Sequence, residues 1–230
     1  MDIVDLLTHG SMEIKGRMPW SSNGTFLAEV TCGQMSVHGV YKPVRGERPL
    51  WDFPRGLHKR ETAAYELSEA LGLGVVPITV IRDGPMGEGS LQQFMEADFD
   101  QHYFTVYEER PELYPQLQAI CVLDLVANNT DRKSGHCLLG TGDRVWAIDN
   151  GLCFAVEPKL RTVIWEFGGQ PIPEPLLAGL RSLVDSMPDT VSCLLNDDEV
   201  EMIAVRAEQL LDRPLFPIDR TGRHYPWPLV

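Results

Sequence analysis

The chain has 230 residues with a formal net charge of −13, and 43% of its residues are hydrophobic. This length and composition are those of a globular protein with a substantial core, and the negative charge disfavours nucleic acid and anionic membranes as partners, since both need clustered lysine and arginine. The N-terminus is acidic and no apolar run approaches the roughly 20 residues that cross a bilayer, which predicts a cytoplasmic protein without a stable membrane anchor.

The first half of the chain is predicted to be rich in strands. Apolar and β-branched segments separated by Gly, Asn and Ser turns indicate five of them. The expected strands cover residues 13–18, 25–32, 36–44, 75–84 and 90–96. One helix is expected among them, over residues 59–72, where apolar residues recur at helical spacing and the pattern stops at Gly72.

The second half of the chain is predicted to be mostly helical. Helical periods cover residues 111–129, 174–187 and 197–212, and a hairpin is expected over residues 137–149. The two halves together predict an α+β fold of two lobes, with a hinge between Met95 and Asp100. Ligands favour clefts between such lobes, so the polar residues expected to face the cleft decide the function.

Two carboxylates follow apolar segments in this second half. Asp131 lies in the polar run NNTDRKSGH, and Asp149 follows a predicted strand and precedes Asn-Gly. Because a hairpin separates them, both can return to the same end of its sheet. One interpretation is that both carboxylates are solvated loop residues. The other is that they serve phosphoryl transfer, which needs oxygen ligands for a metal and a carboxylate near the acceptor hydroxyl.

Lys42 and Glu61 form a second pair of candidate residues. Lys42 shares a strand face with Val40 and Val44, and an inward-facing lysine needs an anion, although an edge-strand position would also explain it. Glu61 begins the next helix, where a carboxylate also suits the helix dipole. A strand lysine paired with a helix glutamate is the ion pair that steadies a nucleotide in phosphoryl-transfer enzymes.

Five short motifs occur in an order that carries a resemblance. They are YKP (41–43), RETAAYEL (60–67), GSLQQF (89–94), NTDRKSGH (129–136) and IDNG (148–151). In this order they resemble the phosphatidylinositol 3-/4-kinase superfamily, most closely a compact actinobacterial branch of phosphatidylinositol-kinase-like proteins. Type II phosphatidylinositol 4-kinases and HipA-type kinases are similar. The resemblance implies a protein-kinase-like fold, with a nucleotide-binding lobe over residues 1–95 and a catalytic lobe over residues 96–230.

The resemblance also implies roles for individual residues. Lys42 would contact the phosphates of ATP, with Glu61 as its helix partner and Glu66 as a second candidate. Asp131 would be the catalytic-loop aspartate, with Arg132 beside it in the family's "DR" motif, and Asp149 would bind the metal. The phosphate loop would be formed by Ser22, Asn23, Gly24 and Thr25. The segment that meets adenine would be Gln93, Phe94 and Met95. Taken alone, the turn around Asn23 and Gly24 indicates a plain hairpin.

His136 departs from the family pattern. The family usually places asparagine there, five residues after the catalytic aspartate, as a second metal ligand. Imidazole suits Mn²⁺ better than Mg²⁺, so either metal is expected, with a preference for Mn²⁺. If His136 binds metal, its ordinary pKa predicts weaker metal binding as the pH falls through about 6.5. The alternative is a strand-capping histidine with no metal role.

The expected function is ATP-dependent transfer of the γ-phosphate to a hydroxyl group. A protein or small-molecule acceptor is favoured over a lipid, because only Lys159 and Arg161 follow the metal motif where an anionic headgroup would bind. Two alternatives remain open. One is a pseudokinase that binds nucleotide or a partner without turnover, and the other is a kinase-fold enzyme that transfers AMP.

Overall fold

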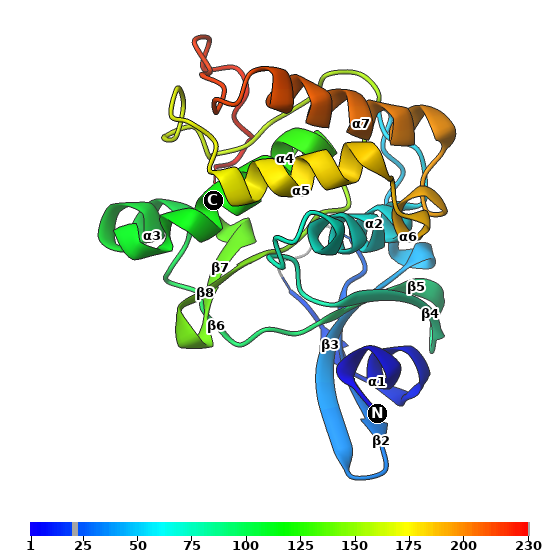
Figure 1. Cartoon of the computed structure of the whole chain (residues 1–230). Coiled ribbons are helices and arrows are strands. Elements are labelled where there is room, and N and C mark those ends of the chain that lie inside the picture. Colours follow the sequence, from blue (N-terminus) through cyan, green and yellow to red (C-terminus); the bar gives the residue numbers. More distant parts are fainter. Residues whose placement is uncertain (20–22, 230) are drawn as a thin grey trace.

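The computed structural model describes residues 1–19 and 23–229, and they form two lobes (Figure 1). The smaller lobe is built on a five-stranded antiparallel sheet with the order β1-β2-β3-β5-β4. Its strands are β1 (Ser11–Arg17), β2 (Phe26–Cys32), β3 (Met35–Pro43), β4 (Thr79–Gly84) and β5 (Gly87–Gln93). All five predicted strands are therefore confirmed, with shifted ends.

One helix of the smaller lobe was not predicted. Helix α1 (Ile3–His9) begins at Asp2, whose carboxylate accepts a hydrogen bond of 2.8 Å from the amide of Asp5. Its Leu6 and Leu7 are buried against the sheet, and α1 lies beside β2 and β3 in Figure 1. A seven-residue helix contains about two turns, too few for a helical period to stand out in the sequence.

The larger lobe is mostly helical, as predicted, and carries a three-stranded sheet of order β6-β7-β8. Its strands are β6 (Ala97–Asp98), β7 (Cys137–Gly140) and β8 (Arg144–Ala147). Its helices are α3 (Tyr103–Glu109), α4 (Tyr114–Ala127), α5 (Glu174–Asp185), α6 (Asp189–Ser192) and α7 (Asp197–Asp212). Helix α7 begins where predicted because Asn196 and Glu199 each accept a hydrogen bond from the other's backbone amide, which forms a capping box.

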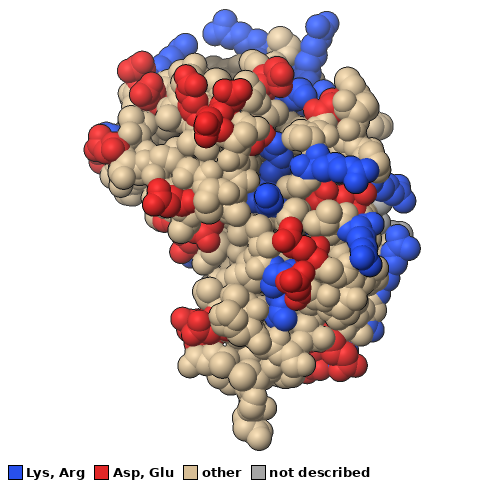
Figure 2. All heavy atoms as spheres, turned by 90° about the vertical axis from the view of Figure 1, so that its right-hand side faces the viewer, with Lys and Arg blue, Asp and Glu red and all other residues tan. Residues whose placement is uncertain are grey.

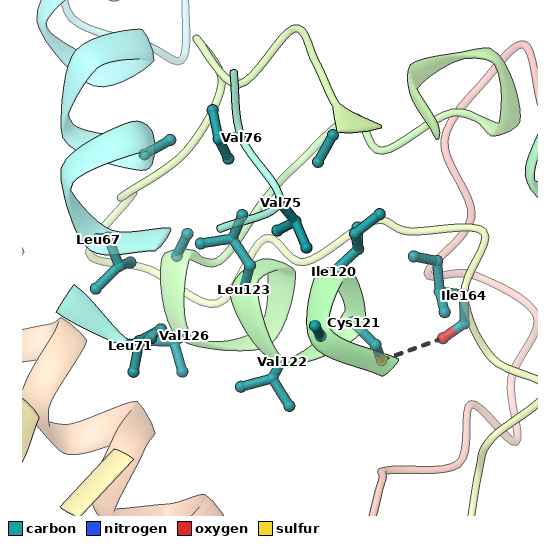
Figure 3. Packing of buried hydrophobic residues seen from close by; sticks show 14 of the residues in the cluster. Leu67, Leu71, Val75, Val76, Ile120, Cys121, Val122, Leu123, Val126 and Ile164 are labelled. Atoms are coloured by element: carbon teal, nitrogen blue, oxygen red, sulfur yellow. Dashed lines mark hydrogen bonds between the residues drawn. The ribbon is translucent and has the colours of Figure 1, made fainter. Parts of the chain in front are cut away.

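Helix α2 (Leu57–Ala70), the predicted helix of the first half, packs into the core of the larger lobe. Figure 3 shows Leu67 and Leu71 beside Leu123 and Val126 of α4. Val75 and Val76 belong to the same core, and the strand predicted from residue 75 begins only at Thr79. Helix α2 therefore joins the two lobes: its apolar residues lie in the larger core, and it also packs against β4 and β5 of the smaller lobe.

The surface carries charges of both signs. On the face shown in Figure 2, acidic side chains are spread over the height of the molecule and basic ones lie among them. Among the described residues, no helix is long and apolar enough to cross a membrane.

Gly179 provides a test of the packing between α5 and the end of α2. A Cβ atom at this position would lie 2.3 Å from the carbonyl oxygen of Leu71, which is backbone and cannot swing away. We expect Gly179→Ala to lower the free energy of unfolding by about 1–3 kcal/mol, despite the higher helix propensity of alanine. Chemical denaturation measures this change. Gly16→Ala is the control, because nothing lies within 4 Å of its Cβ position, and an equal effect of both substitutions would contradict the packing.

Candidate active site

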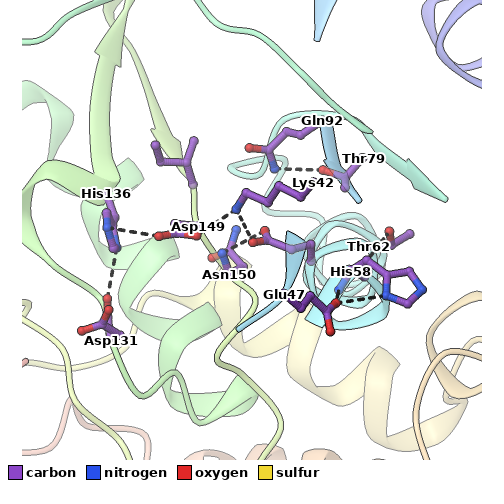
Figure 4. Close-up of polar contacts among 12 residues, drawn as sticks. Lys42, Glu47, His58, Thr62, Thr79, Gln92, Asp131, His136, Asp149 and Asn150 are labelled. Carbon is purple, nitrogen blue, oxygen red and sulfur yellow. Dashed lines mark hydrogen bonds and ion pairs between the residues drawn. The ribbon is translucent and has the colours of Figure 1, made fainter. Parts of the chain in front are cut away.

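A cavity of about 660 Å³ lies between the lobes. Five of the residues predicted from the motifs line it together, although they come from distant parts of the chain. They are Lys42, Glu61, Asp131, His136 and Asp149. Figure 4 shows Lys42 pointing toward Asp149, with His136 on the other side of this carboxylate. The predicted residues Asn23, Gly24, Thr25, Gln93, Phe94 and Met95 line the same cavity, and Ser22 lies outside the described residues.

Lys42 of β3 holds two carboxylates at once. Its ammonium donates to Glu61 Oε1 and, at 2.8 Å, to Asp149 Oδ1. Glu61, not the second candidate Glu66, is thus the helix partner. Burial acts to lower the pKa of Lys42, but the charges of Asp149 and Glu61 outweigh it and raise this pKa above its usual range. The Lys42 charge, in turn, lowers the pKa of Asp149.

The cavity carries more acidic than basic side chains. Its lining contains four carboxylates, Glu47, Glu61, Asp131 and Asp149, and three cationic side chains, Lys42, Arg48 and Lys133. Lys133 lies 3.2 Å from Asp131 Oδ2, yet burial raises the pKa of Asp131 above its usual value. A triphosphate entering this cavity would add further negative charge. A divalent cation bound to the triphosphate would reduce that repulsion.

The backbone at Asp149 adopts a conformation that is uncommon for residues other than glycine. Its φ is +56°, in the left-handed region that Asp and Asn enter most readily. Phe154, five residues later, has a φ of +68° and is fully buried, and its amide donates to the carbonyl of Ala127 at 2.6 Å. Uncommon backbone conformations of this kind persist where the surrounding structure fixes them, and they concentrate at functional sites.

Arg132 lies behind the cavity, not in it. Its side chain is fully buried and forms an ion pair with Asp124 of α4, with Nη2 2.9 Å from Oδ1. The same guanidinium donates to the carbonyl of Ile148 at 2.7 Å and to Asn150 Oδ1 at 2.5 Å. It therefore ties the loop of Asp131 to both sides of Asp149. The prediction placed Arg132 beside the reacting groups, whereas a side chain enclosed in this way has no path to a substrate.

His136 is held in one tautomer by the backbone. Its Nδ1 lies 3.1 Å from the carbonyl oxygen of Asp131, which can only accept a hydrogen bond, so Nδ1 carries the proton. The Nε2 lone pair then faces Asp149 Oδ2 at 3.5 Å. Burial lowers the pKa of His136 to about 4. With this lower pKa, the loss of metal binding that was expected near pH 6.5 is expected at a lower pH instead.

Several backbone amides that were predicted to contact the nucleotide already donate hydrogen bonds within the protein. The amide of Gly24 donates to the carbonyl of Gly46 at 3.0 Å. In the linker, the amide of Gln93 donates to Ile78 and that of Phe94 to His38. These three amides are thus not available to phosphates or adenine in this conformation. Among the amides of the three predicted linker residues, this leaves that of Met95 to contact adenine.

Three residues that organise the site were not predicted. They are Asp124, Asn129 and Asn150. Asp124 accepts from Asn129, from Thr162 and from Arg132, while the Asn129 side chain accepts from the amide of Asp131 at 2.9 Å. The signal in the sequence was a single acidic residue within the apolar run AICVLDLVA, since a buried carboxylate needs partners.

The two lobes, the lysine–glutamate pair and the strand-end aspartate define a protein of the protein-kinase-like fold, which confirms the predicted fold class. Residues 57–210 match the family described as phosphatidylinositol 3- and 4-kinase. The chain belongs to this family, as the motif resemblance indicated.

The chain is also similar to individual known proteins. The chain is 38% identical over 260 residues to protein Rv2133c of Mycobacterium tuberculosis (strain ATCC 25618 / H37Rv), an alignment that covers 97% of this chain and 94% of that protein. Two solved structures share its fold at low identity. A Golgi casein kinase with Mn/ADP bound has a TM-score of 0.59 at 15% identity, covering 99% of this chain and 79% of that one. Hydra Fam20 with sugar has a TM-score of 0.60 at 12% identity, covering 91% and 86%.

The pKa of His136 predicts a specific dependence of stability on pH. This pKa is about 4 in the folded protein and near 6.5 in an unfolded chain, so between these values only the unfolded chain takes up the proton. Stability should therefore fall as the pH drops through this window, by roughly 1–2 kcal/mol at pH 5 relative to pH 7.5. Denaturant titrations of metal-free protein measure it. His136→Asn should lose less stability than wild type over this range, and parallel curves would contradict the assignment.

Proposed function

We propose that this protein is an ATP-dependent phosphotransferase that transfers the γ-phosphate to a hydroxyl group. The observation that carries the proposal is the Lys42 ammonium, which joins Glu61 of α2 to Asp149 in the cavity that Asp131 also lines. Phosphoryl transfer needs charge stabilisation and positioning more than covalent chemistry. The site supplies charge stabilisation and positioning through a lysine for the phosphates, a carboxylate for a metal and a second carboxylate for the acceptor.

Each of these residues has a distinct task in the proposed reaction. Lys42 binds and orients the phosphates, and Glu61 holds Lys42 in place. Asp131 accepts the proton of the acceptor hydroxyl at its carboxylate, a task that suits a carboxylate whose pKa burial has raised toward the working pH. Asp124 and Arg132 take no part in proton transfer. They fix the backbone on either side of Asp131 and Asp149.

The donor atoms of the site fit a divalent cation that shares its ligands with the nucleotide. Among the described residues, no group of three or more His, Cys, Asp or Glu side chains could hold a metal on its own. Asp149 and the Nε2 atom of His136 supply two donors, and phosphate oxygens would complete the set, as is usual for Mg²⁺. Imidazole favours Mn²⁺. When bound, the metal would neutralise charge on the transferred phosphoryl group.

The acceptor we favour is a protein or small molecule. Lys159, one of two cations after the metal motif, donates to the carbonyl of Asp52 at 2.9 Å and lies 5.5 Å from the ring centre of Phe53. These contacts within the chain leave Arg161 as the exposed cation of this segment. One exposed charge is a poor site for an anionic lipid headgroup.

A second candidate function is nucleotide binding without phosphoryl transfer, or with transfer of AMP. It is favoured by the amide of Gly24, which donates to the carbonyl of Gly46 and is therefore not available to a phosphate. Mass spectrometry of the candidate acceptors after incubation with the protein and ATP distinguishes the outcomes. A mass gain of about 80 Da on an acceptor indicates transfer of phosphate, and a gain of about 329 Da indicates transfer of AMP. No mass gain together with retained ATP binding indicates a pseudokinase.

We expect Lys42→Ala and Asp149→Ala each to weaken ATP binding in the presence of Mn²⁺ by at least tenfold. Each substitution removes a charge contact, which is worth about 1.5–3 kcal/mol. Isothermal titration calorimetry measures the change. Lys15→Ala is the control, because Lys15 pairs with Glu13 and Glu29 on the sheet away from the cavity. Unchanged affinity in both folded variants would contradict nucleotide binding at this site.

Asp131→Asn separates binding from chemistry. The substitution keeps the size of the side chain but removes the base, so we expect ATP affinity within about threefold of wild type and a loss of turnover of 10²-fold or more. Initial rates of ADP release with a saturating acceptor measure the effect. Arg132→Lys should instead lower thermal stability as well as turnover, since one ammonium cannot replace the several hydrogen bonds of the guanidinium. Full turnover by Asp131→Asn would remove Asp131 from the mechanism.

A further inference from the structure

The helix that carries Glu61 is attached to the larger lobe by a buried ion pair. Arg60, next to Glu61 on α2, forms this pair with Glu199 of α7, and both side chains are buried. Arg60 also donates to the carbonyl of Cys153 and lies 5.2 Å from the ring centre of Phe53. Removing one partner of a buried pair leaves the other charge without compensation, so we expect the loss of either side chain to weaken the contact between α2 and α7.

Glu199 is fixed independently of Arg60. Its Oε2 accepts from the amide of Asn196 at 3.1 Å, and its own amide donates to Asn196 Oδ1 at 3.0 Å. The carboxylate that receives Arg60 is therefore part of the cap that begins α7. Because α7 packs on α4 and α5, Arg60 is attached to the most helical part of the larger lobe (Figure 1).

Arg60 and Glu61 hold the same short segment from two sides. The Oε2 atom of Glu61 accepts from the amide of Asn150 at 3.0 Å, while Arg60 donates to Cys153. Both contacts fall within the four residues that follow Asp149. Consecutive residues of a helix point about 100° apart, so rotation or sliding of α2 would disturb both contacts at once. The apolar residues of α2 that lie in the larger core oppose the same motions.

We propose that Arg60 and Glu199 are positioning residues, which lock α2 onto the larger lobe so that Glu61 stays on Lys42 without any partner or modification. The catalytic role of the Arg60–Glu199 contact rests on the proposed function, whereas the contact itself is present in the protein without nucleotide.

The experiment is competitive labelling of lysines with an amine-reactive reagent, quantified by peptide mass spectrometry on nucleotide-free protein. Lys42 is compared with Lys59, an exposed lysine on the same helix as Arg60. We expect Lys42 to label more slowly than Lys59 in wild type. In Arg60→Met and in the milder Glu199→Gln, whose amide can still cap α7, Lys42 should label about tenfold faster, because it loses one of its two charged hydrogen bonds.

The controls separate positioning from general destabilisation. Glu61→Gln gives the labelling rate of Lys42 without its helix partner, and Arg60→Met combined with Glu61→Gln should be no faster, because Arg60 acts through Glu61. Arg181→Met removes an exposed Arg–Glu pair with Glu174 and should leave Lys42 unchanged. Equal labelling of Lys42 in wild type and in folded Glu199→Gln would overturn the proposal. Since no nucleotide is present, that outcome is distinct from a failure of ATP binding.

Discussion

The ion pair between Arg132 and Asp124 is the interaction on which the rest of the site depends. Both side chains are fully buried, and each would be costly to bury alone. The pair is stable because every charged group finds further partners: Asp124 accepts from Asn129 and Thr162, and Arg132 donates to Ile148 and Asn150. Helix α4, the loop of Asp131 and the end of β8 therefore meet at one guanidinium.

This arrangement explains how two carboxylates stay close together in one cavity. Asp131 and Asp149 repel each other, and that repulsion contributes to the raised pKa of Asp131. The Arg132 contacts fix the backbone on both sides of Asp149, which also accounts for its left-handed conformation. The geometry of the cavity carboxylates is thus fixed by Asp124 and Arg132, whose side chains do not face the cavity.

The sequence predicted elements and motif residues well, and buried polar contacts poorly. Periodicity located the five strands and α2, α4, α5 and α7, because each carries several repeats of an apolar pattern. The order of the motifs predicted that Lys42, Glu61, Asp131 and Asp149 lie at one site, and all four line the same cavity. It could not show that Arg132 is buried or that the Gly24 amide is already bound. Those facts depend on Asp124 and Gly46, which no local pattern links to them.

The charge balance of the cavity connects the acidic composition to the choice of ligand. A protein with a net charge of −13 repels a free triphosphate at long range, and the cavity itself has one more carboxylate than cationic side chains. Lys42 cannot offset this alone, since Glu61 and Asp149 already share its charge. In the proposed function, a divalent cation bound to the nucleotide would reduce this excess of negative charge. His136 fits this condition, because a neutral imidazole at this position would add a metal donor without adding to the negative charge that Asp131 and Asp149 already create.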